Sequence, residues 1–130
     1  MAFVCRLLPA LAALDCLAVG LWAIFQPDGL FALLGCTPPH DAFLWSVFGY
    51  LTVANAVCLA AAAARPLEFG GFALPPWVGR LLSCALWLWL LGQNRVALAS
   101  EPLWGLLAHD AFWLVALTVF LLPQFIMWRR

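Results

Sequence analysis

The sequence has no lysine and little charge of either sign. Its 130 residues include six basic and six acidic ones, so 9% of the chain is charged and the formal net charge is zero. Soluble domains usually carry about 25% charged residues. A chain with so little charge lacks the polar surface that water requires, and without a basic patch it is not expected to bind nucleic acid.

The cysteines lack the spacing that metal sites and disulfide frameworks require. There are five, at positions 5, 16, 36, 58 and 84, and no two form a C-x-x-C pair. Four lie in apolar runs, where we expect small buried hydrophobic residues. Nucleophile–base pairs and phosphate loops are also missing from the sequence. The sequence therefore predicts no catalytic residue and no metal ligand, and it favours a non-enzymatic protein.

Apolar sequence is what the chain has in abundance, with 67% hydrophobic residues and a mean hydropathy of +1.03. A helix needs roughly 20 mostly apolar residues to cross a bilayer. Turn-forming clusters divide the chain into four such runs, which predict helices at about 3–25, 41–64, 76–92 and 102–128. The predicted fold class is all-α: a polytopic membrane protein with a four-helix bundle in one domain, 1–130.

The segments between the helices carry further signals. The apolar turn at 29–34 is too short to span and is expected at the membrane interface, and 65–75 is expected to be a loop. Most arginines fall on one side of the predicted topology, opposite Arg95: Arg6, Arg65, Arg80, Arg129 and Arg130. This bias predicts that both termini lie in the cytoplasm.

Two short sequences occur twice. His-Asp-Ala-Phe is found at 40–43 and at 109–112, and Arg-Leu-Leu lies near the start of the first and third predicted helices. The pattern fits a duplicated helical hairpin related by an axis along the membrane normal. Matches of this length between apolar segments also arise by chance, so both interpretations stay open.

A series of loose motifs is spread along nearly the whole chain: the segment Pro27 to Gly35, Pro38-Pro39, Phe43-Leu44-Trp45, Gly49, Ala64-Arg65-Pro66 and Asp110. This pattern resembles the small bacterial DoxX-like four-helix membrane proteins. The resemblance implies a bacterial inner-membrane protein. It also implies a link to quinone-dependent oxidation of thiols or sulfur compounds, or to the assembly of a periplasmic redox enzyme. This sequence departs from the redox members because it has no paired cysteine motif.

Asp15 is the most unusual residue of the first predicted helix. It lies about 12 residues into that helix, roughly 18 Å along its axis and near the bilayer centre. An unpaired carboxylate there costs about 2.5–3.5 kcal/mol, so we expect a polar partner. Asn55, with Thr52 one turn away, is the predicted one. The pair is interpreted either as a structural hydrogen bond or as a proton or ligand site.

His109, Asp110, Trp113 and His40 are the candidate cofactor-binding residues. The two histidines are expected in the outer half of the membrane, where they could hold a tetrapyrrole, and the group as a whole could hold a quinone. Neighbouring helical residues point about 100° apart, which argues against His109 and Asp110 forming a compact pair. Arg80 is expected to extend to the cytoplasmic interface.

Three functional hypotheses follow. The leading one is a non-enzymatic accessory or scaffold subunit that packs laterally in a larger redox or photosynthetic membrane complex. The second is a DoxX-like redox protein that binds quinone or a tetrapyrrole near the outer leaflet. The third is a small proton-coupled carrier that uses Asp15. The expected partners are the lipid bilayer and other membrane subunits or further copies of this chain.

Overall fold

The structure is a computed structural model that describes residues 2–26, 28, 29, 32, 42–92 and 101–128. Within these ranges the chain is almost entirely helical, and no strand is present. The helical elements are α1 (Ala2–Phe25), α3 (Ala42–Ala64), α4 (Pro66–Phe69), the 3-10 helix η1 (Gly70–Ala73), α5 (Leu74–Gly92) and α6 (Glu101–Trp128). The all-α prediction is confirmed for the described residues.

The long helices end close to where the sequence placed them, since every predicted boundary lies within two residues of the observed one. The expected loop at 65–75 is wrong, because α4 and η1 occupy it. Pro66 suits the first position of α4, where no backbone donor is needed. Gly70 then packs against Gln124 of α6, and a Cβ there would lie 2.6 Å from the Gln124 side chain. The expected interfacial turn at 29–34 lies mostly outside the described residues.

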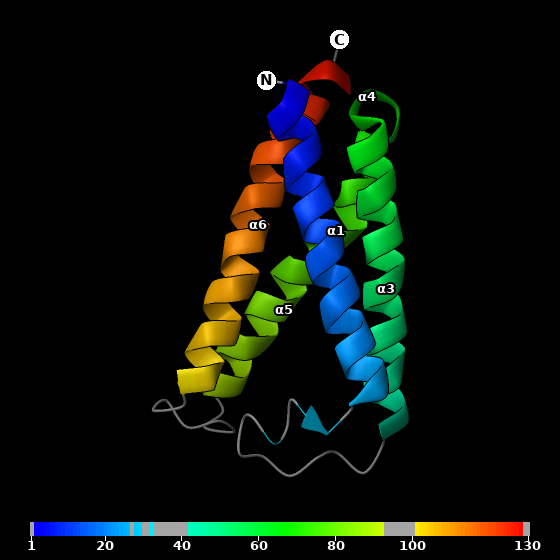
Figure 1. The fold of residues 1–130 in the computed structure, drawn as a ribbon. Coiled ribbons are helices and arrows are strands. Elements are labelled where there is room, and N and C mark those ends of the chain that lie inside the picture. Colours follow the sequence, from blue (N-terminus) through cyan, green and yellow to red (C-terminus); the bar gives the residue numbers. More distant parts are fainter. Residues whose placement is uncertain (1, 27, 30–31, 33–41, 93–100, 129–130) are drawn as a thin grey trace.

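The four long helices form two antiparallel hairpins. α1 packs mainly against α3, and α5 packs mainly against α6. Figure 1 shows the start of α1, the end of α6 and α4 together at one end of the bundle. The predicted cytoplasmic location of that end stays a prediction. The proposed duplication is also untested, although Arg6 is exposed whereas its counterpart Arg80 lies inside the bundle.

Two glycines bring α1 and α3 into close contact. A Cβ at Gly20 would lie 2.9 Å from the Gly49 carbonyl oxygen, and a Cβ at Gly49 would lie 2.9 Å from the Gly20 carbonyl oxygen. A side chain of any size at either position would therefore push the backbones apart. Small residues at such crossings are typical of membrane helices, where close packing replaces the hydrophobic effect.

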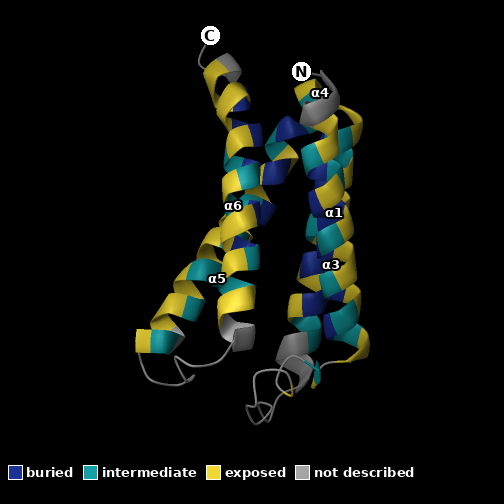
Figure 2. Ribbon diagram, turned by 60° about the vertical axis from the view of Figure 1, so that its left-hand side comes forward, coloured by how far each residue is buried: buried dark blue, intermediate teal, exposed yellow. Residues whose placement is uncertain are grey.

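Among the described residues, three helical stretches are long and apolar enough to cross a membrane: Arg6–Phe25, Ser46–Ala64 and Trp104–Ile126. α5 is not among them, so the fourth crossing stays a prediction. Figure 2 shows buried residues where the helices meet and exposed ones around the outside. Many exposed residues are large and apolar, including Leu14 at 64% and Val57 at 67% exposed. Such a surface is consistent with a membrane protein.

Candidate functional site

Arg80 joins three helices at the centre of the bundle. Its Nη2 lies 2.5 Å from Asp15 Oδ2 on α1, and its Nη1 lies 2.5 Å from Asp110 Oδ1 on α6. The three side chains are 12%, 20% and 10% exposed, respectively. Ion pairs this enclosed are only weakly screened by solvent. The guanidinium is therefore held between two carboxylates from different helices.

His109 closes these contacts into a ring. Its Nε2 lies 2.8 Å from Asp15 Oδ1, and its Nδ1 lies 3.3 Å from Asp110 Oδ1. We call Asp15, Arg80, Asp110 and His109 the charge ring. With neutral His109 the ring carries one net negative charge, because two carboxylates face one guanidinium. A proton on His109 brings the net charge to zero, so this proton decides the electrostatics of the site.

The two carboxylates differ in how fully they are bonded. Asp110 accepts from Arg80 through Oδ1, and its Oδ2 accepts from Ser83 Oγ and from Trp87 Nε1, the latter at 3.1 Å. Asp15 accepts from Arg80 and His109 alone among the described residues. A carboxylate has about four acceptor positions. Asp110 is therefore close to saturated, whereas Asp15 is not.

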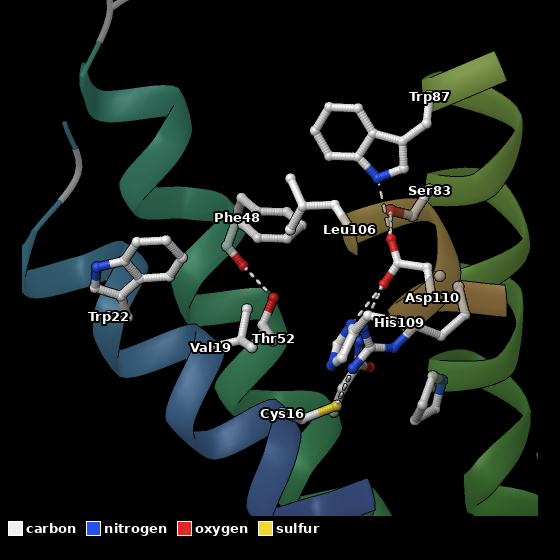
Figure 3. Close-up of a pocket in the computed structure, with 14 residues that line it drawn as sticks. Cys16, Val19, Trp22, Phe48, Thr52, Ser83, Trp87, Leu106, His109 and Asp110 are labelled. Atoms are coloured by element: carbon white, nitrogen blue, oxygen red, sulfur yellow. Dashed lines mark hydrogen bonds and ion pairs between the residues drawn. The ribbon is translucent and has the colours of Figure 1, made fainter. Parts of the chain in front are cut away.

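A cavity of about 140 Å³ lies beside the charge ring, between the two hairpins. Figure 3 shows its polar wall on α5 and α6, formed by Ser83, Trp87, His109 and Asp110. The apolar wall on α1 and α3 is formed by Val19, Trp22 and Phe48. Arg80, Thr52, Asn55, Pro76, Gly79, Leu106 and Cys16 complete the lining of the cavity. Asp15 does not line the cavity, but it bonds His109 and Arg80, which do.

Helical periodicity explains how one cavity receives residues from four helices. On α3 the lining residues are Phe48, Thr52 and Asn55, which follow one another by four and three positions and so share a face. On α5 the residues Arg80, Ser83 and Trp87 follow the same spacing. Each helix thus turns one mixed stripe toward the cavity and leaves an apolar face outside.

Two predictions about polar partners are wrong. Asp15 pairs with Arg80 and His109, not with Asn55, because these two side chains reach it from α5 and α6. Thr52 donates to the Phe48 carbonyl oxygen of its own helix at 2.8 Å. Arg80 does not extend to the interface either, because its guanidinium pairs with two carboxylates inside the bundle.

The structure places two of the four candidate cofactor-binding residues at the cavity. His109 and Asp110 both line the cavity. His109 Nδ1 lies 3.3 Å from Asp110 Oδ1, so these two side chains contact each other although they are neighbours on one helix. Trp113 is 9% exposed and belongs to the packed core instead, with its ring edge against Phe112. His40 lies outside the described residues.

The contacts of His109 do not suit a histidine that binds iron. Both ring nitrogens already face protein groups, Nε2 toward Asp15 and Nδ1 toward Asp110 and Arg80. In the described part of the chain, no three histidine, cysteine or acidic side chains gather as a metal-binding group. The tetrapyrrole hypothesis thus gains no support from this histidine.

Sequence reasoning missed Ser83 and Cys16 as residues of the site, and it considered Trp87 only as a docking surface for another subunit or a flat cofactor. Ser83 and Trp87 bond the same carboxylate oxygen, and Cys16 Sγ lies 3.6 Å from Arg80 Nη2. The available signal was the spacing of Arg80, Ser83 and Trp87, which places three hydrogen-bond donors on one face of an otherwise apolar helix.

Comparison with protein-family models, with curated proteins and with solved structures finds no match. The resemblance to DoxX-like proteins therefore remains a prediction, and functional arguments rest on the geometry of the charge ring and its cavity.

Proposed function

We propose that this protein binds a small amphipathic ligand with a single ring, of the quinone type, in the cavity between its two hairpins. The observation that carries the proposal is the composition of the cavity: one wall is aromatic and aliphatic, and the other presents the ionisable side chains Arg80, His109 and Asp110. Apolar pockets with a few convergent polar groups are the usual form of small-molecule sites.

The size of the cavity favours one ring. Its volume is about 140 Å³, close to that of an apolar cavity of about 150 Å³ that binds benzene. A benzoquinone headgroup has this scale, whereas a tetrapyrrole contains four rings and a much wider plane. We therefore favour the quinone over the tetrapyrrole among the ligands expected from the sequence.

The polar wall supplies partners for ring oxygens. The guanidinium of Arg80 and the hydroxyl of Ser83 both border the cavity, and their hydrogens can be shared between a carboxylate and a second acceptor in a three-centre bond. The aromatic side chains Trp22, Phe48 and Trp87 provide faces on which a flat ring can stack. Together these groups suit a flat ring with oxygen substituents.

Tryptophan fluorescence tests the proposal directly. A short-chain, fully substituted benzoquinone has no ring position for addition of a thiol, so it does not react with Cys16. Titrated into the purified protein in detergent, it should quench tryptophan emission in a saturable manner. In Trp87→Phe the saturable amplitude should fall, because Trp87 lines the cavity.

Trp89→Phe is the matched control. Trp89 lies two positions along the same helix, is 58% exposed and does not line the cavity. Its variant should keep the saturable amplitude of the wild-type protein. Quenching that never saturates would refute quinone binding, and so would equal amplitudes in the two variants.

A proton-coupled carrier is a second candidate, favoured by one further contact. His109 lines the cavity and bonds Asp15, which lies behind it, so a proton can pass between Asp15 and the cavity through the imidazole. In proteoliposomes that contain a pH-sensitive dye, this candidate predicts ligand-dependent proton flux that Asp15→Asn abolishes. Equal flux with and without protein would remove it.

The accessory-subunit hypothesis, the bacterial inner membrane and the cytoplasmic termini stay predictions. Gentle solubilisation from native membranes followed by mass measurement tests the first. A large defined assembly would support an accessory role in addition to ligand binding, and a monomer or homodimer would leave ligand binding as the sole proposal.

A further inference from the structure

Asn55 is a polar side chain of the cavity wall that makes no hydrogen bond to any residue the structure describes. It lies on α3, partly buried, and lines the cavity. Among the described residues, none donates a hydrogen bond to its amide or accepts one from it. A side-chain amide offers two N–H donors and one acceptor oxygen. Because buried polar groups are normally paired, an unpaired amide on a cavity wall calls for a partner inside the cavity.

The other polar groups of the wall differ from Asn55 in this respect. Ser83 and Trp87 both donate to Asp110, and Thr52 donates to a carbonyl oxygen of its own helix. These groups can bind a ligand only by sharing or breaking an existing bond. Asn55 can bind one without that cost, so it is the wall residue with the most to gain from a ligand.

Gly79 keeps open the space in front of Asn55. A Cβ built at Gly79 would lie 3.8 Å from Asn55 Nδ2, which is ordinary van der Waals contact, and would meet nothing else within 4 Å. The glycine therefore does not serve close helix packing, unlike Gly20 and Gly49. It precedes Arg80 on α5, so the open space lies next to the charge ring.

We propose that Asn55 is the specificity residue of this cavity, that its amide binds an oxygen of the ligand ring, and that Gly79 leaves the room for that oxygen. The inference rests on the proposed function and adds the chemical feature that is recognised. The cavity then selects an oxygen-substituted ring over an unsubstituted aromatic ring of the same size. Water filling the space is the competing occupant.

Two ligands, compared in the wild-type protein and in one variant, test the proposal. Affinity is measured for the fully substituted short-chain benzoquinone and for a benzene ring with the same alkyl chain. In Asn55→Leu, the affinity for the benzoquinone should fall about fivefold, since one hydrogen bond contributes roughly 1 kcal/mol and 1.4 kcal/mol corresponds to tenfold. The affinity for the alkylbenzene should not fall, which separates lost hydrogen bonding from altered shape.

Stability without ligand provides a second readout. A structural role for Asn55 would make Asn55→Leu less stable than the wild-type protein. The proposal expects equal or higher stability, because no described residue bonds the amide and leucine adds apolar contact.

A glycine pair tests the space itself. Gly79→Ala places a methyl group at 3.8 Å from the amide without a clash, so folding should be kept while benzoquinone affinity falls several-fold. Gly92→Ala, on the same helix, meets no atom within 4 Å and lies away from the cavity. Its affinity should match that of the wild-type protein.

The possible outcomes distinguish a failure of the proposed function from a failure of the role assigned to Asn55. Wild-type protein that binds neither ligand overturns the proposed function and this inference with it. Benzoquinone binding that is equal in the wild-type protein and Asn55→Leu overturns the inference alone, with water as the partner of Asn55. Loss of both ligands in Asn55→Leu also overturns it, because shape would then explain the effect.

Discussion

Removing Arg80 is the sharpest test of the charge ring. Arg80→Gln leaves two carboxylates, 20% and 10% exposed, without the cation between them. Breaking an enclosed ion pair by removing one partner typically costs about 3–5 kcal/mol, because the remaining charge is left uncompensated. We expect a loss of this size in the free energy of unfolding. The exposed pair of Arg65 and Glu68 is the control, and Arg65→Gln should cost under about 1 kcal/mol.

Second substitutions in the Arg80→Gln background should restore stability unequally. When Arg80 is gone, both carboxylates keep their contact with His109, and Asp110 also keeps the donors Ser83 and Trp87. Neutralising Asp110 would turn two charge-assisted hydrogen bonds into neutral ones, and each such change costs about 1 kcal/mol. Asp15→Asn should therefore restore about 2 kcal/mol more than Asp110→Asn.

The assay is unfolding in mixed micelles, in which SDS is titrated into protein held in a mild detergent while near-ultraviolet circular dichroism follows the tryptophans. The reasoning is refuted if Arg80→Gln stays within about 1 kcal/mol of the wild-type protein. It is also refuted if Asp110→Asn restores as much stability as Asp15→Asn, because the difference in bonding between the two carboxylates would then have no energetic consequence.

Three further predictions concern packing and access. Gly49→Ala should destabilise the α1–α3 contact by more than 1 kcal/mol, whereas Gly105→Ala, whose methyl group meets nothing within 4 Å, should have little effect in the same SDS titration. Thr118→Val should cost about 1 kcal/mol, because it removes the 2.7 Å hydrogen bond from Trp77 Nε1; a neutral result by the same assay would argue against that bond. The third prediction uses a variant that retains Cys16 as its sole cysteine. Because Cys16 lines the cavity, bound benzoquinone should slow alkylation of its thiol, as measured by mass spectrometry. An unchanged alkylation rate would place the ligand elsewhere.

Hydrophobicity and turn residues are local signals, and the helix ends follow from them. α3 ends at Ala64, just before Arg65-Pro66, and α5 ends at Gly92, where the sequence predicted both helix ends. The close approach at Gly20 and Gly49 could also be expected from residue size. These features depend on neighbouring positions in the chain, so a single sequence is enough to predict them.

The charge ring could not be predicted in the same way. Asp15 and Arg80 are 65 positions apart, and Asp15 and His109 are 94 positions apart. Whether such residues meet depends on how each helix is rotated about its axis and how the two hairpins pack. The sequence placed Asp15 inside the first helix and predicted a polar partner, but its position along the helix did not distinguish Asn55 from Arg80.

The sequence by itself thus determined an all-helical, strongly apolar chain, with its helix boundaries and with a few ionisable residues inside its helices, because these properties follow from local composition and spacing. The tertiary structure alone decided that four of those residues form a ring, that a cavity of one-ring size adjoins it and that Asn55 faces that cavity without a described partner. The physical reason is that hydrogen bonds and ion pairs act over about 3 Å, and only the packing of the helices brings distant positions within that range.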